Sequence, residues 1–286
     1  MQGEERATPR KEGIALPIRW LVTDFDGTLL DEHGAITAET LRALHDAQRG
    51  GIPLIAASGR MALSMLPYVR QLASPLPFIA CNGAEIRDPA TLAMLRTQYL
   101  PTALALEIAQ VLEAEGCYYQ VYQGDGYYYA AQTPESQAYQ ASSGVAGEAV
   151  GRLSAFIHQP LPKMLIIAPP AQVPLLAERL RARFGAQLTV TVSDARYVEI
   201  THCGASKGAA LRWLCGHLGL VLAEGMAFGD AENDASMLAA AGVSVAMGNA
   251  QPSLKAQAAH VCGTNAQDGI ARFLRRTVLR DAAWAG

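Results

Sequence analysis

Two short segments of the sequence hold four aspartates whose spacing could support metal or phosphate chemistry. Asp24 and Asp26 lie in DFDGTLL, and Asp230 and Asp234 lie in GDAENDASML. At an extended strand end, Asp24 and Asp26 point to the same side because successive side chains alternate. If the two segments meet, the carboxylates repel one another unless a cation lies among them or some are protonated. Oxygen ligands with no histidine or cysteine nearby favour Mg²⁺, which also binds phosphate oxygens.

Other segments offer partners for an anion. The turns Gly27-Thr28 and Ser58-Gly59 supply backbone N–H groups and hydroxyls that could surround a phosphate. Lys207, at the start of an amphipathic stretch, supplies a positive point charge. A carboxylate nucleophile, a metal, an anion cradle and a lysine together suit phosphoryl transfer.

The elements that must position these residues are apolar segments predicted to be strands. Four polar clusters, which begin at Asp24, Ser58, Asn82 and Gly229, each follow such a segment. The segments are 18–23, 52–57, 78–81 and 226–228. Ligands of open α/β sheets bind outside the carboxyl ends of the strands, so we expect the clusters to meet in one crevice.

Helical stretches alternate with these strands, which predicts a parallel sheet with crossover helices. We expect helices over 38–49, with Thr37 as N-cap, over 61–72, around 211–218 and over 232–241, and a further strand over 243–247. The middle of the chain mixes helices with a hairpin around Gly124-Asp125-Gly126, which indicates an α+β insert. We therefore expect a flexible tail over 1–17, an α/β core over 18–86 and 201–280, and an α+β domain over 87–200.

Composition excludes several classes of protein. The 286 residues are 50% hydrophobic and 17% charged, which suits a folded chain of one large or two modest domains. The formal net charge of -3 argues against nucleic-acid binding, and no apolar run reaches the roughly 18 residues of a membrane span. The polar N-terminus lacks a signal-peptide core, and the five cysteines show no CxxC spacing. A cytoplasmic location is the expectation.

Five motifs occur in an order that resembles a known family. They are DFDGTLL at 24–30, ASGR at 57–60, NGA at 82–84, SKG at 206–208 and GDAENDASML at 229–238. The set resembles the haloacid dehalogenase-like (HAD) hydrolases, most of all the Cof-type branch with an α+β (C2B-type) cap. The resemblance covers essentially the whole chain beyond the tail. It implies a Rossmann-like core with the insert as cap, and Mg²⁺-dependent hydrolysis of phosphomonoesters.

The resemblance also implies roles for individual residues. Asp24 is the expected nucleophile, and Asp26 the acid that protonates the leaving oxygen and then deprotonates water. Mg²⁺ would be held by the carboxylates of Asp24 and Asp230 and by the backbone carbonyl of Asp26. The expected phosphate-binding residues are Ser58, Gly59 and Lys207. The expected supporting residues are Thr28, Asn82, Asn233 and Asp234. Asn82 would face the substrate where core and cap meet. Asn233 and Asp234 would orient Lys207 and metal waters, with Asp234 as an alternative direct metal ligand.

The function that follows is a phosphatase of small phosphorylated metabolites, sugar phosphates in the first place, acting through an aspartyl-phosphate. A phosphomutase or phosphotransferase would use the same intermediate, and a phospho-accepting signalling module would keep the phosphate as a switch. A carbon–halogen hydrolase would not need Asp26 and the metal ligands. The expected partner is a small phosphorylated metabolite, and we expect binding neither to nucleic acid nor to a membrane. The sequence does not give the oligomeric state.

Tyrosines concentrate in the predicted hairpin and just after it. They either form a half-buried β surface or line a substrate pocket, and strand alternation allows both. The residues are Tyr118, Tyr119, Tyr122, Tyr127, Tyr128, Tyr129 and Tyr139.

Overall fold

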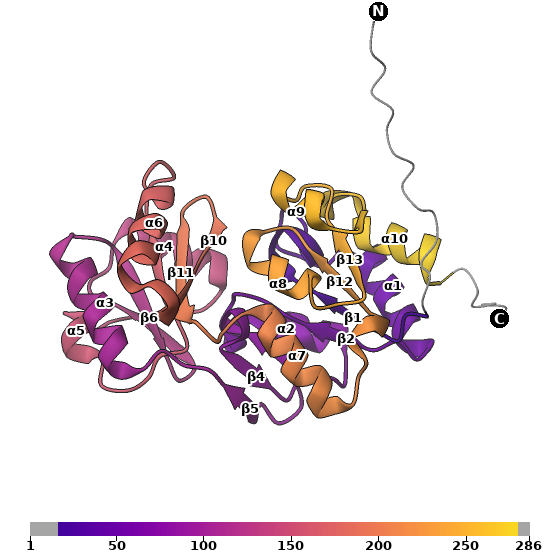
Figure 1. The fold of residues 1–286 in the computed structure, drawn as a ribbon, viewed down its shortest axis with the longest axis horizontal. Helices are drawn as coiled ribbons and strands as arrows, with labels where there is room; N and C mark the ends of the chain where they lie inside the picture. The colour runs from indigo at the N-terminus through magenta and orange to yellow at the C-terminus, as the bar shows by residue number, and fades with distance from the viewer. Residues whose placement is uncertain (1–16, 280–286) are drawn as a thin grey trace, which may run out of the picture.

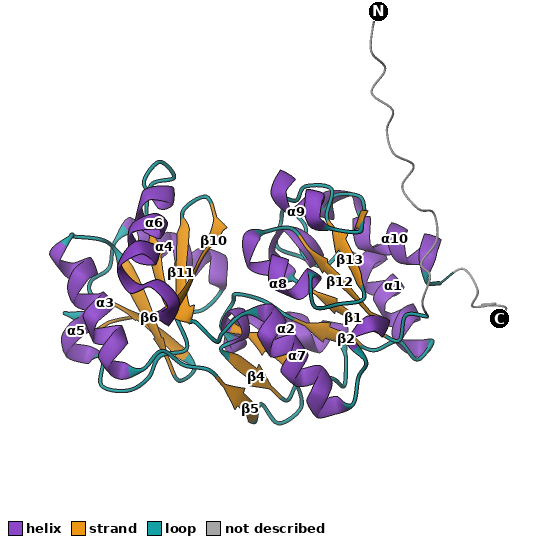
Figure 2. Cartoon of the chain, in the orientation of Figure 1, coloured by secondary structure: helices purple, strands orange, loops and turns teal. Residues whose placement is uncertain are grey.

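The computed structural model describes residues 17–279, which form two lobes side by side (Figure 1). The predicted tail over 1–17 lies outside the described residues except for Pro17. Figure 2 shows a sheet in each lobe with helices packed around it. Within residues 17–279, every helix is too short or too polar to span a bilayer.

The first lobe contains a five-stranded sheet in which all neighbouring strands are parallel, as predicted. Its strand order is β14-β13-β12-β1-β2. The strands are β1 (Trp20–Thr23), β2 (Leu54–Ala56), β12 (Gly225–Gly229), β13 (Val243–Ala246) and β14 (His260–Val261). The chain moves outward from β1 in one direction and from β12 in the other. The pair β1 and β12 is therefore the switch point of the sheet, where α/β proteins bind ligands.

Helices cover this sheet. They are α1 (Ala38–Arg49), α2 (Ala62–Leu72), α7 (Lys207–Leu218), α8 (Ala235–Leu238), α9 (Pro252–Gln257) and α10 (Gly269–Thr277). The predicted start of α1 is confirmed, because the Thr37 hydroxyl accepts a hydrogen bond from the backbone N–H of Thr40 at 3.1 Å. Helix α1 packs against α10, and α7 packs against α8.

The third predicted strand forms but does not join the parallel sheet. Strand β3 (Phe78–Ala80) pairs antiparallel with β4 (Glu85–Arg87), which pairs with β5 (Met94–Thr97). A single parallel bridge, Ala57 to Ile79, links β3 to the end of β2. The reversal occurs at Cys81, Asn82 and Gly83, whose φ values of 49°, 54° and 92° turn the chain back on itself.

The predicted helix over 232–241 is wrong in length. The chain forms a single 3₁₀ turn, Glu232–Asp234, and the one-turn helix α8. Gly242 directly precedes β13, and its N–H donates a hydrogen bond to the Leu222 carbonyl at 2.9 Å. A Cβ at Gly242 would lie 1.9 Å from the Ala223 carbonyl oxygen, so this close approach requires glycine.

The second lobe contains a six-stranded sheet of order β10-β11-β9-β6-β7-β8, antiparallel except where β8 meets β7. Its strands are β6 (Tyr119–Gln123), β7 (Gly126–Tyr129), β8 (Glu148–Ala149), β9 (Met164–Ile167), β10 (Leu188–Asp194) and β11 (Tyr197–His202). Its helices are α3 (Thr102–Ala114), α4 (Pro134–Ser143), α5 (Leu153–Phe156) and α6 (Val173–Phe184). This lobe is the predicted α+β insert, called the cap below. The boundaries at 86/87 and 200/201 stay a prediction.

The tyrosines of the hairpin separate onto the two faces of the cap sheet. Tyr119 packs with the residues of α3 and α6 on one face. A second apolar cluster on the other face contains Tyr122, Tyr127, Tyr129 and Tyr139, together with Met61, Cys81, Ala84 and Ala205 of the first lobe. Tyrosines therefore form much of the contact between the cap and the core.

Candidate active site

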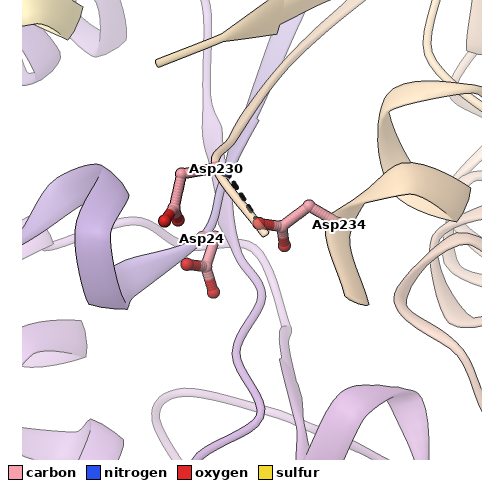
Figure 3. Close-up of side chains that lie close together, drawn as sticks. All are labelled: Asp24, Asp230 and Asp234. Carbon is pink, nitrogen blue, oxygen red and sulfur yellow. Dashed lines mark hydrogen bonds between the residues drawn. The ribbon is translucent and has the colours of Figure 1, made fainter. Parts of the chain in front are cut away.

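Three aspartates meet at the carboxyl end of the parallel sheet (Figure 3). Asp24 follows β1, and Asp230 and Asp234 follow the neighbouring strand β12. One carboxylate oxygen from each lies within 4.8 Å of the other two. The Asp234 carboxylate is fixed by the backbone of the preceding turn, because its Oδ2 accepts hydrogen bonds from the N–H groups of Asp230 at 2.9 Å and Ala231 at 3.1 Å. We call Asp24, Asp230 and Asp234 the acidic cluster.

Lys207 lies among these carboxylates. Its Nζ donates to Asp24 Oδ1 at 2.5 Å and to Asp234 Oδ1 at 2.6 Å, and its side chain is fully buried. The lysine is the first residue of α7, whose N-cap Ser206 accepts a hydrogen bond from the Ala209 N–H at 3.1 Å. The N-cap Ser206 therefore fixes where α7 begins, and so where Lys207 enters the acidic cluster.

The electrostatics of the cluster are strongly perturbed. Burial, followed by repulsion from Asp234, raises the pKa of Asp24 well above its usual value, although Lys207 opposes this. Burial and Asp234 also raise the pKa of Asp230, to about 7. Burial lowers the pKa of Lys207, but Asp234 and Asp24 more than offset it, so the net shift is upward. Three carboxylates and one ammonium leave a surplus of negative charge that a hard divalent cation with oxygen ligands would neutralise.

Gly27 and Thr28 shape the position of Asp230. Gly27 has a φ of 75°, and a Cβ there would lie 2.4 Å from Asp230 Oδ2, so the turn requires glycine. The Thr28 hydroxyl donates to Asp230 Oδ1 at 2.8 Å. The DFDGT segment thus supplies Asp24 and also orients the carboxylate of the neighbouring strand.

Ser58 and Asn82 lie on two loops that are joined by backbone hydrogen bonds. The Asn82 N–H donates to the Ser58 carbonyl at 3.0 Å, and the Cys81 N–H donates to the Arg60 carbonyl at 2.8 Å. The Ser58 hydroxyl accepts from the Arg60 N–H at 3.1 Å. Asn233 contacts this region rather than Lys207, because its Nδ2 donates to Asn82 Oδ1 at 3.0 Å.

The Asp26 carboxylate pairs with Arg60 and is not one of the three carboxylates of the acidic cluster. Arg60 donates to both of its oxygens, from Nε at 2.8 Å and from the guanidinium Nη2 at 2.6 Å. The Asp26 side chain remains 58% exposed. Sequence reasoning gave no role to Arg60, although it lies in the ASGR motif directly after Ser58 and Gly59.

A cleft of about 280 Å³ lies between the acidic cluster and the cap. Asp24, Asp26 and Ser58 line it from the core, and Lys163 and Glu199 line it from the cap. Sequence reasoning missed these two cap residues. A signal for them was present in the sequence. Lys163 begins the otherwise apolar strand segment 163–168, and Glu199 interrupts the otherwise apolar segment 197–200.

A parallel sheet with carboxylates at its switch point, below an inserted cap, defines an α/β enzyme that acts on small ligands enclosed between its two lobes. A model of the haloacid dehalogenase-like hydrolases matches residues 21–274. The chain belongs to the haloacid dehalogenase-like hydrolase family, as the five motifs predicted.

Curated relatives and solved structures agree with this assignment. The HMP-PP phosphatase of Serratia proteamaculans is 32% identical, over 88% of this chain and 92% of its own. The pyridoxal phosphate phosphatase YbhA of Escherichia coli is 30% identical, over 90% of this chain and 97% of its own. The structure of a haloacid dehalogenase-like hydrolase from B. subtilis superimposes with a TM-score of 0.81 at 28% identity, covering 90% and 99% of the two chains. The chain is an enzyme of the phosphatase class within this family.

Proposed function

We propose that this protein is a Mg²⁺-dependent phosphatase that hydrolyses small phosphorylated metabolites through an aspartyl-phosphate on Asp24. The observation that carries the proposal is Lys207, which is buried between Asp24 and Asp234, together with Asp24, which lines the cleft. The ammonium can stabilise negative charge on a phosphoryl group, and it opposes the rise in the pKa of Asp24 that burial causes. A carboxylate held beside a cation, and open to a cleft, is suited to nucleophilic attack on phosphorus.

The reaction then has two displacement steps. An Asp24 carboxylate oxygen bonds to phosphorus, the bond from phosphorus to the leaving oxygen breaks, and Asp26 gives that oxygen a proton. Asp26 next takes a proton from water, whose oxygen bonds to phosphorus as the bond to Asp24 breaks. For both steps the Asp26 carboxylate, which lines the cleft, has to exchange a hydrogen bond with Arg60 for one with the leaving oxygen or water.

Asp24, Asp230 and the backbone carbonyl of Asp26 are the groups that we propose hold the metal. Asp234 already accepts hydrogen bonds from Lys207 and two backbone N–H groups, so it acts through the lysine. When bound, Mg²⁺ neutralises the negative charge of the phosphoryl oxygens and of Asp24. Ser58 and Gly59 are proposed to contact the phosphoryl oxygens from the opposite side.

The substrate is proposed to be a small polar phosphomonoester. A cleft of about 280 Å³ lies at the lower end of the range for ligand pockets. Hydroxyls of Ser142, Ser143 and Ser193 line its cap side, which suits a leaving group rich in hydroxyls such as a sugar. Two relatives are named as phosphatases of HMP-PP and pyridoxal phosphate, so phosphorylated heterocycles belong in the same screen.

The test is phosphate release from a panel of phosphorylated metabolites, with p-nitrophenyl phosphate as a general substrate. Turnover should require Mg²⁺ and stop with a chelator, and Asp24→Asn should lower the rate by about 10³-fold or more. Turnover that ignores chelation, or an Asp24→Asn variant with normal rates, would contradict the proposal. Transfer of the phosphoryl group to an added sugar phosphate in place of water would identify a phosphomutase.

A further inference from the structure

One charged residue of the cap reaches into the core lobe. Lys163 directly precedes β9, and its side chain is 2% exposed. Its Nζ donates to the Gly59 carbonyl at 2.6 Å, and this carbonyl belongs to the loop that follows β2. The ammonium also lies 3.4 Å from Glu199 Oε2 and 4.5 Å from the centre of the Tyr122 ring. The cap thus places a buried cation directly on the Ser58–Arg60 loop.

Glu199, on the neighbouring cap strand β11, contacts the second core loop. Its Oε2 accepts a hydrogen bond from Asn82 Nδ2, and its Oε1 accepts one from the Ser193 hydroxyl at 2.9 Å. Asn82 in turn accepts a hydrogen bond from Asn233, which lies between Asp230 and Asp234 in sequence. A continuous series of hydrogen bonds therefore runs from the cap to the segment that carries the acidic cluster.

The fit between Glu199 and the core loop is tight. A Cβ at Gly59 would lie 3.1 Å and 3.2 Å from the two Glu199 carboxylate oxygens and 3.0 Å from Asn82 Oδ1. These contacts are closer than side chains normally tolerate, so the glycine of the ASGR motif has a cap residue directly against it. The Gly59 backbone is held from one side by Lys163 and packed against by Glu199.

Stability alone does not account for a buried ion pair at this place. Desolvation of two charges costs about as much as their attraction returns, and apolar side chains of similar volume often pack as well or better. Hydrogen bonds from a buried charged pair do, however, fix one relative geometry of the parts that they join. Here the parts are the cap strands β9 and β11 and the two core loops next to Asp24.

We propose that Lys163 and Glu199 are positioning residues through which the closed cap fixes the Ser58–Arg60 loop and Asn82 beside the nucleophile. Neither side chain contacts the acidic cluster; both act on the loops that border it. Opening of the cap breaks the Lys163–Gly59 and Glu199–Asn82 contacts together, and this frees the loop proposed to contact the phosphoryl oxygens. Closure therefore completes the phosphate site as well as enclosing the substrate.

The structural part of the inference is tested by hydrogen–deuterium exchange, which does not depend on activity. Lys163→Met removes the ammonium at similar length, and Glu199→Gln removes the charge at the same shape. Each should speed exchange of the backbone amides of 58–60 and 81–83 by about fivefold or more, because those loops open locally more often. Arg152→Gln is the matched control, since Arg152 pairs with Glu113 on the cap with its side chain 73% exposed. Unchanged exchange in both variants overturns the proposal.

The kinetic part rests on the proposed phosphatase function. With p-nitrophenyl phosphate, Lys163→Met should lower kcat/KM by about tenfold or more and should weaken inhibition by inorganic phosphate by a similar factor. Glu199→Gln, which keeps hydrogen-bonding groups toward Asn82, should show a smaller loss, and Arg152→Gln none. A loss of thermal stability with unchanged phosphate inhibition would show a merely structural pair and overturn the proposal. If the wild type hydrolyses no phosphomonoester, the proposed function fails, and the exchange experiment still decides the positioning role.

Discussion

At the scale of single residues, the hydrogen bonds of Asp234 distinguish its role from the roles of Asp24 and Asp230 in the acidic cluster. Its two carboxylate oxygens accept from Lys207 and from the backbone N–H groups of Asp230 and Ala231. These donors hold the Asp234 carboxylate in place, and through its hydrogen bond to Lys207 it directs the lysine toward Asp24. Within residues 17–279 the Asp230 carboxylate accepts a hydrogen bond only from the Thr28 hydroxyl, and its pKa is raised. Asp230 and Asp24 are therefore the carboxylates that gain most from a bound cation.

The raised pKa of Asp230 predicts how the metal-free protein responds to pH. The pKa in the folded protein is about 7, above the ordinary aspartate value of 3.8 that applies to the unfolded chain. Between these values the folded state holds more protons, so stability falls as the pH rises through the window. Asp230→Asn cannot acquire this charge. With chelator present, we expect its free energy of unfolding relative to wild type to increase by on the order of 3 kcal/mol from pH 4 to pH 8.

Urea unfolding of both proteins at several pH values measures this difference. Glu178→Gln serves as the control, because Glu178 lies exposed on α6, far along the chain from the acidic cluster. A stability difference between Asp230→Asn and wild type that stays constant from pH 4 to pH 8 would show that burial does not penalise this carboxylate.

The acidic cluster was predictable from sequence because Asp24 and the segment with Asp230 and Asp234 each follow an apolar strand. Lys207, at the start of an amphipathic stretch, was expected to join them, and the structure brings the four residues together. The engagement of Asp26 with Arg60 was not predictable, because side-chain direction in a turn depends on a partner 34 residues away. The same limit applies to the cap residues of the cleft, whose neighbours in space come from the other lobe.

At the scale of elements, the position of Lys207 depends on how closely α7 approaches α8. A Cβ at Gly208 would lie 2.1 Å from the Ser236 carbonyl oxygen, and the Gly208 N–H donates to the Ser236 hydroxyl at 3.0 Å. A methyl group cannot be accommodated there unless the two helices separate. Since Lys207 is the preceding residue, any separation moves the ammonium relative to Asp24.

Gly208→Ala should therefore destabilise the fold by about 1–3 kcal/mol and also lower kcat. Gly216 provides a control in the same helix, because it is exposed and a Cβ there would meet nothing within 4 Å. Gly216→Ala should stabilise the protein by about 0.5–1 kcal/mol through helix propensity and leave kcat unchanged. Urea unfolding and steady-state rates measure both effects. Equal stability changes in the two variants would contradict the packing argument.

Elements were predictable where the chain marks their ends chemically. Thr37 and Gly50 bound α1 at the predicted residues. Helix α10 carries no such start signal, because its N-cap Asp268 has a φ of 53° and makes no side-chain cap hydrogen bond. Helix α4 does begin with the capping box of Thr133 and Ser136, a signal that our sequence analysis did not use. The departure of β3 from the parallel sheet was not predictable, because it depends on positive φ values that non-glycine residues rarely adopt.

At the scale of the whole molecule, the cap meets the core through apolar and charged contacts of different strength. The tyrosine cluster shared by the two lobes is buried, whereas two ion pairs between the lobes are partly exposed. Arg87 of β4 pairs with Asp125 in the β6–β7 turn at 2.8 Å. Arg181 of α6 pairs with Glu232, next to Asn233, at 3.1 Å. The exposed pairs are the contacts that salt can weaken while the apolar contact persists.

Glu232 therefore offers a measurable link between cap closure and ionic strength. Its carboxylate contacts Arg181 and also accepts a hydrogen bond from the Val192 N–H at 3.4 Å. The side chains of Glu232 and Arg181 are 47% and 46% exposed. An exposed pair contributes up to about 1 kcal/mol, so Glu232→Gln should reduce the closed population by about fivefold at most. We expect KM to rise by up to about that factor at low salt.

The same comparison at high salt separates this electrostatic effect from any damage to the site. At about 1 M salt the screening length falls to roughly 3 Å, so the KM values of wild type and Glu232→Gln should converge. Glu115→Gln is the matched control, because Glu115 forms an exposed ion pair with Arg179 that lies entirely within the cap. Its KM should equal that of wild type at both salt concentrations. A KM difference for Glu232→Gln that survives at high salt would mean that Glu232 acts through its neighbour Asn233 rather than through closure of the cap.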